Sequence, residues 1–119
     1  MLPQQHRLHR SADFSSVVRG GRRIGRRTIV LHILQVTDEA DVPTARSGGP
    51  RVGLVVSKAV GNAVTRHAVS RKLRHVAADV IAGVPDDVDI VIRALPASGT
   101  ATSLELVKDV RSAVRKFLR

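Results

Sequence analysis

The chain has 119 residues, which suffice for one domain, and 43% of them are apolar, so that domain can bury one core. The core must be aliphatic, because the chain contains no Tyr or Trp and only two Phe. Twenty Lys and Arg against ten Asp and Glu give a formal net charge of +10, which indicates an anionic partner, nucleic acid first and an anionic membrane second. The absence of Cys excludes disulfides, zinc–thiolate sites and thiol nucleophiles.

Residues 1–10 are polar and basic, and we interpret them as a flexible arm that either touches a partner or remains solvated. They lack the apolar core of a signal peptide, and no apolar run approaches the length of a membrane span, so we expect a cytoplasmic protein. Ser11 is the predicted N-cap of a short helix that ends at Gly20-Gly21. Its apolar face is formed by Phe14, Val17 and Val18.

Four arginines follow within six residues, at positions 22, 23, 26 and 27. Phosphate would relieve their mutual repulsion, although a solvated loop or edge strand is the alternative. Residues 28–36 predict a strand in which His32 is half-exposed rather than a metal ligand. Residues 37–50 predict a loop. It leads to a second strand over 51–57, which we expect to be buried on both faces and to pair antiparallel with strand 28–36.

A helix over residues 62–82 is predicted next, with Asn62 as its N-cap and Gly83 and Pro85 beyond its end. The residues of its predicted buried face are Val69, Leu73, Val76, Ala77 and Val80. A polar strip of His67, Arg71 and Arg74 borders this face, whereas Lys72 and His75 lie on the other side. Arg66 projects toward the apolar side in the first turn.

Residues 88–94 predict a third long strand. Asp86, Asp87 and Asp89 precede or enter it, and we interpret them as turn residues, with Asp89 pointing outward, rather than as a metal site. Thr102-x-x-Glu105 is a capping box that opens an amphipathic final helix. The order of elements indicates one α/β sheet packed by helices, in which strands 51–57 and 88–94 are parallel.

The chemistry of the basic helix favours binding over catalysis. No carboxylate lies between Lys58 and His75, and the chain contains no nucleophile elbow, Walker loop or dinucleotide-binding glycine pattern. The broad apolar face of the helix favours laying its polar edge along a backbone rather than inserting the helix into a DNA groove. Structured RNA suits such backbone and shape recognition better than DNA does.

Three segments of the chain resemble the bacterial ribonuclease P protein subunit: Val52-Gly-Leu-Val-Val-Ser-Lys58, Val60-Gly-Asn-Ala-Val-x-Arg66 and Arg71-x-x-Arg74. The flanking segments around Asp13-Phe14, Ile29–His32 and Val91–Ala97 are similar to that family as well. The resemblance implies a single ribosomal-protein-like domain over residues 1–119, of α+β class and order α-β-β-β-α-β-α. Its four-stranded mixed sheet would have a first strand within residues 22–25 and a left-handed βαβ crossover.

The resemblance also implies an accessory subunit of an endoribonuclease holoenzyme, with one protein for each catalytic RNA. That RNA would hold Mg²⁺ and hydrolyse the phosphodiester at the 5′ end of mature tRNA, and the protein would broaden substrate use and aid the metal-dependent reaction. No protein residue would be catalytic or bind the metal. The single-stranded 5′ leader would lie in a cleft between the sheet and the N-terminal helix, against Phe14, Val18, Arg27, Val30 and His32. The catalytic RNA would face Lys58, Asn62, Arg66, His67, Arg71 and Arg74.

The chain departs from the family signature on the basic helix. The signature reads Arg-Asn-Arg and then, after one residue, Lys-Arg, whereas this chain has Arg66-His67-Ala68 and Ser70-Arg71. Two other hypotheses remain at this point: a structural RNA-binding protein of ribosomal type, and a stand-alone metal nuclease.

Overall fold

The structure is a computed structural model, and it describes residues 7–8, 10–35, 50–85 and 87–118. The elements follow in the order α1 (Ser11–Gly20), β1 (Arg22–Gly25), β2 (Ile29–Gln35), β3 (Arg51–Val55), α2 (Ala63–Val80), β4 (Val88–Ala94) and α3 (Ser103–Leu118). Short 3-10 turns occupy Lys58–Val60, Ile81–Gly83 and Pro96–Gly99. The order α-β-β-β-α-β-α and the short first strand agree with the expectation from sequence. No helix among the described residues has the length and apolarity needed to cross a membrane.

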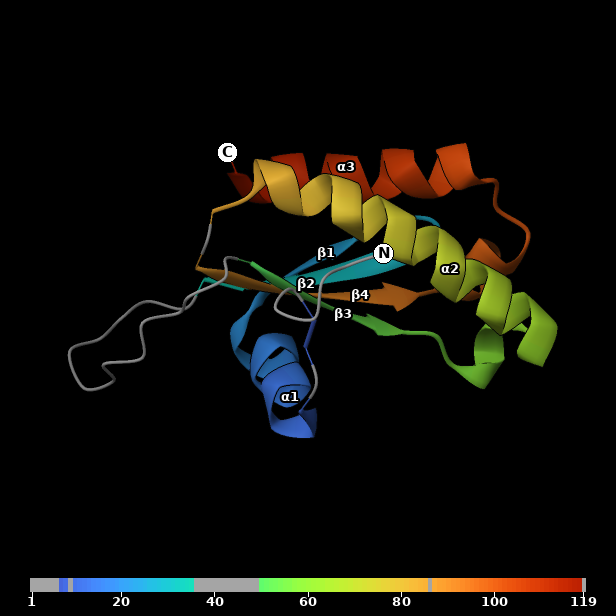
Figure 1. Ribbon diagram of the computed structural model, residues 1–119, viewed down its shortest axis with the longest axis horizontal. Coiled ribbons are helices and arrows are strands. Elements are labelled where there is room, and N and C mark those ends of the chain that lie inside the picture. The colour runs from blue at the N-terminus through green and yellow to red at the C-terminus, as the bar shows by residue number, and fades with distance from the viewer. Residues whose placement is uncertain (1–6, 9, 36–49, 86, 119) are drawn as a thin grey trace.

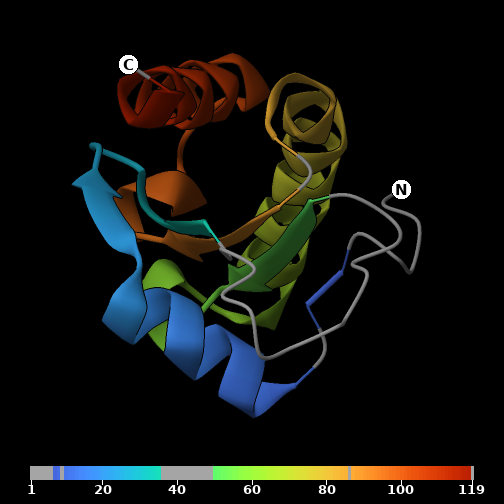
Figure 2. The same cartoon turned by 90° about the vertical axis from the view of Figure 1, so that its left-hand side faces the viewer.

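The four strands form one mixed sheet in the order β1-β2-β4-β3. β4 pairs antiparallel with β2 and parallel with β3, as expected for the βαβ unit. The prediction that strands 28–36 and 51–57 are neighbours is therefore wrong, because β4 lies between them. β2 and β4 are buried along most of their length, which suits their central positions in the sheet. β3 is less buried and lies at an edge. The crossover from β3 through α2 to β4 is left-handed, as the two views show together (Figures 1 and 2).

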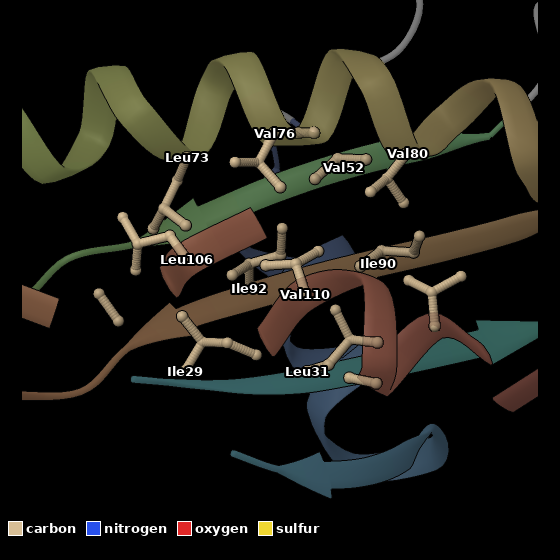
Figure 3. Close-up of a cluster of buried hydrophobic side chains, with 14 of the residues drawn as sticks. Ile29, Leu31, Val52, Leu73, Val76, Val80, Ile90, Ile92, Leu106 and Val110 are labelled. Carbon is tan, nitrogen blue, oxygen red and sulfur yellow. The ribbon is translucent and has the colours of Figure 1, made fainter. Parts of the chain in front are cut away.

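Helices α2 and α3 cover one face of the sheet, and α1 lies on the opposite face (Figures 1 and 2). Strand alternation sorts the side chains between the two layers, so that Ile29, Leu31 and Ile33 of β2 enter the larger core under α2 and α3. Leu73, Leu106 and Val110 meet this sheet surface from the helices (Figure 3). A smaller cluster under α1 contains Leu8, Val17 and Val91, with Phe14, Leu34 and Val55 packed against it.

The helix ends follow the sequence signals closely for α2 and α3. Asn62 Oδ1 accepts a hydrogen bond from Thr65 N at 2.9 Å, and all five predicted buried residues of α2 are buried. The capping box forms as predicted, with Thr102 N donating to Glu105 Oε1 at 3.0 Å and Glu105 N donating to Thr102 Oγ1 at 3.2 Å. In α1, however, Arg10 and not Ser11 is the N-cap, and it makes no side-chain capping bond.

Two side chains near the edge strand lie deeper than the sequence predicted. Leu8 is 6% exposed and its N–H donates to Val52 O at 3.1 Å, so this part of the predicted flexible arm runs beside β3. Asp89 does not point outward to solvent, since it is 4% exposed and accepts hydrogen bonds from Arg51 Nε at 3.0 Å and Nη2 at 2.8 Å. The rest of the predicted arm, most of the predicted loop and Asp86 lie outside the described residues.

Candidate nucleic-acid interface

On the face of the sheet that carries α1, Phe14 of the helix packs against Gly53 of β3. The ring of Phe14 packs directly over Gly53, where the missing side chain leaves room for it, and Leu8 lies beside both. Phe14 is only partly buried. An aromatic ring fixed in this way and still accessible at one side is a surface on which a nucleic-acid base can stack.

The Phe14 ring also lines a pocket of about 560 Å³ at the β3 edge of the sheet. The pocket continues past Val52 and Leu54 to Ser70 and Arg74 of α2, and Arg7 borders it. The structure thereby brings together one residue from each of two predicted surfaces, Phe14 from the leader cleft and Arg74 from the basic helix. The sequence did not single out Arg7 or Ser70 as members of one site, because only the fold places them on the same edge.

Val18, Val30 and His32 lie around the same sheet face but differ in accessibility. Val18 on α1 is 37% exposed, whereas Val30 and His32 on β2 are each 4% exposed. The prediction of a half-exposed His32 is therefore wrong. Within the described part of the chain, neither ring nitrogen of His32 has a hydrogen-bond partner. Burial, followed by the charges of Arg93 and Arg23, holds the pKa of His32 below its ordinary value, which favours the neutral imidazole.

Arg23 and Arg93 flank His32 with positive charge. Arg23 pairs with His32 in the β1–β2 ladder, and Arg93 pairs with the adjacent Val30 in the β2–β4 ladder. Both arginines are exposed. Arg93 was not predicted as a site residue, although strand alternation offered the signal, since it falls between the buried Ile92 and Ala94 and so faces the α1 side.

Arg27, which was predicted with the leader cleft, is directed elsewhere. It lies in the turn between β1 and β2 and forms an exposed ion pair with Glu105 at the start of α3. Hydrogen bonds with Thr102 and then the Arg27 charge hold the pKa of Glu105 below its ordinary value. The structure therefore does not bring Arg27 into contact with Phe14 or His32.

An ion-pair network holds α1 against the sheet. Arg51 donates two hydrogen bonds to Asp89 and lies 3.7 Å from Asp13 Oδ2 on α1, and Asp13 in turn lies 3.9 Å from Arg10. The hydrogen bond with Asp89 raises the pKa of Arg51 above its ordinary value. Asp13 directly precedes Phe14, so the network links the helix that carries this ring to strand β3.

The start of α2 presents Lys58, Asn62 and Arg66 in different ways. Lys58 is exposed in a 3-10 turn, and Asn62 is occupied as the N-cap of the helix. Gly61 between them has φ 156°, a conformation that favours glycine, and a Cβ there would also crowd Thr65. The guanidinium of Arg66 donates to Val56 O from Nε at 3.3 Å and from Nη2 at 3.2 Å. Arg66 therefore ties the first turn of α2 to the end of β3.

The predicted strip on α2 is exposed, but its members do not share one groove, and His67 lines a shallow hollow on α2 together with Arg71. Arg74 lines the pocket with Phe14, whereas Arg71 lines a groove of about 380 Å³ between α2 and α3. Lys72 and His75 line that second groove as well, so they share a surface with Arg71, contrary to the prediction. Lys72 Nζ donates to Ala101 O at 3.3 Å. The sequence could not place these side chains together because the second wall of the groove comes from α3.

Comparison with known proteins places the whole chain in one family. The family model described as Ribonuclease P matches residues 2–118. The ribonuclease P protein component of Nocardia farcinica is 51% identical over 130 residues, covering 98% of this chain and 83% of that protein. The corresponding protein of Corynebacterium diphtheriae is 51% identical over 119 residues, covering 100% and 98%.

Solved structures agree on the fold. The Staphylococcus aureus RNase P protein superposes with a TM-score of 0.75 at 22% identity, covering 92% of this chain and 93% of that one. The Thermotoga maritima RNase P protein gives a TM-score of 0.70 at 17% identity, covering 89% and 92%. With a family model spanning nearly every residue and relatives at about half identity, the chain belongs to the ribonuclease P protein family.

Proposed function

We propose that the chain is the RNA-binding protein subunit of a ribonuclease P holoenzyme, in which it holds the single-stranded 5′ leader of precursor tRNA beside the catalytic RNA. The observation that carries the proposal is the pocket shared by Phe14 and Arg74. It makes the sheet surface under α1 continuous with the basic helix α2. A substrate strand and a catalytic RNA bound at these two surfaces would therefore meet at the β3 edge.

The leader surface combines one stacking side chain with phosphate-binding cations. Phe14 stacks on a base, and Val18 offers exposed apolar area beside it. Arg93 and Arg23 attract the backbone, while Val30 and His32 form the floor between them. The family resemblance adds Arg27 to this surface, and its ion pair with Glu105 makes it the weakest member.

The surface for the catalytic RNA lies on α2 and its approach. Lys58, His67, Arg71 and Arg74 are exposed and contact phosphates, whereas Asn62 and Arg66 position the helix through their bonds to Thr65 and Val56. Contacts of this kind dominate affinity and make it strongly dependent on salt. Ala68 and Ser70 contribute no charge at positions where the family signature is basic, and Lys72 in the adjoining groove supplies an alternative cation.

The proposal assigns the catalytic Mg²⁺ to the RNA subunit. Each carboxylate of the described residues is already engaged within the protein: Asp13 with Arg10 and Arg51, Asp79 with Arg111, Asp87 with Gln35, Asp89 with Arg51, Glu105 with Arg27, and Asp109 with Thr28. Among these residues no three His, Asp or Glu side chains gather as a metal site would require. The part played by the protein is to position RNA, and the reaction would take place in the cytoplasm with one protein for each catalytic RNA.

Reconstitution tests the proposal. Purified protein, the organism's ribonuclease P RNA and a precursor tRNA are combined over a series of Mg²⁺ concentrations, and cleavage at the 5′ end of the mature tRNA is measured. The protein should lower the Mg²⁺ concentration at which the RNA cleaves, and protein alone should leave the precursor intact. Cleavage by the protein alone, or an unchanged Mg²⁺ requirement, would contradict the proposal.

A further inference from the structure

A third cationic surface lies away from α1 and α2, on the outer flank of α3. A groove of about 430 Å³ between the β1–β2 turn and the C-terminal half of α3 is lined by Arg26, Ser112, Arg115 and Lys116. Figure 2 shows why this groove is separate, since α3 has β1 on one side and α2 on the other. The exposed pair Arg111–Asp79 marks the α2 flank of α3, and Ser112 marks the opposite flank.

The guanidinium of Arg26 is held in place within this groove. Its Nε donates to Ser112 Oγ at 2.7 Å and its Nη2 donates to Ser112 O at 3.4 Å, while Nη1 donates to Gly25 O at 2.9 Å. The Ser112 hydroxyl is itself oriented, because it donates to Asp109 O at 3.1 Å. A guanidinium whose side-chain freedom has already been removed loses less entropy when it binds an anion.

The groove gathers three cations, Arg26, Arg115 and Lys116. Every carboxylate among the described residues is engaged elsewhere, and none lines the groove. The two carboxylates of α3, Glu105 and Asp109, bond Arg27 and Thr28 nearer the helix start. A cationic groove with no carboxylate in its lining suits an anion, and the exposed Arg115 carries the donor fork that phosphate oxygens match.

We propose that this groove binds a phosphodiester backbone of RNA and is a third RNA contact of the protein, beyond the leader surface and the α2 surface. The proposal rests on the RNA-binding function proposed above. All four lining side chains are polar or cationic, so the groove offers nothing apolar to insert into a lipid surface. Binding at three sides of the small domain would let one protein brace RNA segments that are far apart in sequence.

The test is a salt titration of binding to ribonuclease P RNA with Arg115→Gln and Lys116→Gln, made singly. Both residues are exposed, so neither change removes a buried contact. Each should reduce the slope of log affinity against log salt by about 0.7 to 0.9, the value for one lost phosphate contact. Lys108→Gln is the matched control, because Lys108 is an exposed cation of the same helix outside the groove. Its slope should equal that of the unmodified protein.

Arg71→Gln in the same titration separates the two proposals. The titration is repeated for precursor tRNA binding to the assembled holoenzyme, and slopes unchanged by Arg115→Gln and Lys116→Gln in both titrations would overturn the groove alone. No binding of the unmodified protein to the RNA would overturn the proposed function. Equal reductions for the groove variants and Lys108→Gln would reveal a general charge effect and would also overturn the groove.

A tethered cleavage probe identifies the source of the RNA. The chain has no cysteine, so Lys116→Cys provides one attachment point for iron–EDTA. In the assembled holoenzyme with precursor tRNA, hydroxyl radicals should cut either the catalytic RNA or the tRNA body near the groove. The RNA that is cut is the one that the groove binds. If neither RNA is cut, the groove does not contact RNA in the holoenzyme, and the proposal is overturned.

Discussion

The ring of Phe14 fills the space in which a side chain at Gly53 would begin, since a Cβ atom there would collide with Phe14 Cζ and approach Leu8 Cβ to 3.2 Å. Gly53→Ala should therefore displace the Phe14 ring. Loss of base stacking would weaken binding of precursor tRNA to the holoenzyme by up to about 3 kcal/mol, with mature tRNA unaffected. Affinity measurements on the two tRNAs check this, and equal losses for both would contradict it.

Two variants control this experiment. Gly25→Ala adds the same methyl group at a strand position where nothing lies within 4 Å of the new Cβ, so its binding should be unchanged. In the double variant of Gly53→Ala with Phe14→Ala, the loss should be no greater than in Phe14→Ala alone, because both changes remove one interaction. Additive losses would mean that Gly53 acts independently of the ring.

Asn62 combines a capping role with a predicted RNA contact, and two substitutions separate them. Asn62→Ala should lower the free energy of unfolding by about 0.5 to 2 kcal/mol, because Thr65 N loses its acceptor. Asn62→Asp keeps the cap and should leave stability nearly unchanged while weakening binding to the catalytic RNA through its negative charge. Denaturant unfolding and RNA titration give the two readouts, and unimpaired RNA binding by Asn62→Asp would remove Asn62 from the RNA surface.

Arg71→Ala should weaken binding to the catalytic RNA and reduce its salt dependence. One lost phosphate contact lowers the slope of log affinity against log salt by about 0.7 to 0.9. Lys108→Ala removes the same charge from a surface assigned to no RNA and should leave the slope unchanged. An unaltered slope for Arg71→Ala would show that this side chain does not touch phosphate.

The Arg51–Asp89 pair should matter far more for stability than the Arg111–Asp79 pair. Asp89 is buried, so Arg51→Met, which removes its two donors, should cost about 3 kcal/mol or more. Arg111 and Asp79 are each 55% exposed, and Arg111→Met should cost less than about 1 kcal/mol. Denaturant unfolding of both variants gives the comparison, and similar costs would contradict the claim that buried Asp89 depends on Arg51.

His32 should make the protein less stable below neutral pH. Its pKa is lower in the folded chain than its ordinary value of 6.5, so the unfolded chain binds more protons between the two values. The contribution of neutral His32 to the free energy of unfolding is therefore fully present above pH 6.5. It is lost as the pH falls toward the folded-state pKa, with a slope of at most about 1.4 kcal/mol per pH unit. His32→Leu should flatten this dependence between pH 7 and 5, whereas exposed His75→Gln should retain it.

Local signals in the sequence predicted local structure well. The spacing of Val69, Leu73 and Val76 predicted the buried face of α2, and the Thr102–Glu105 capping box predicted the start of α3. These signals act between residues three or four positions apart, where helix geometry fixes which side chains meet. The Ser11 N-cap failed by one residue, a displacement typical of helix ends.

Features that depend on the packing of distant segments could not be predicted from the residues. The insertion of β4 between β2 and β3, the burial of Asp89 by Arg51 and the meeting of Phe14 with Arg74 each join residues that are far apart in the chain. The left-handed crossover runs against the general preference for right-handed ones, and the family resemblance supplied it. The groove of Arg26 and Lys116 needed the contact between the first hairpin and the last helix.

The short segment beside β3 bears on solubility. An edge strand with free backbone donors and acceptors invites another chain to pair with it, which is how sheets polymerise. Here Arg7 bridges to Val52 in parallel register and Leu8 N–H takes up the Val52 carbonyl, so one end of the edge is already occupied. The positive charge of Arg7 also repels the same edge of another copy of the chain. This part of the β3 edge is therefore less available for pairing with a strand of another copy of the chain.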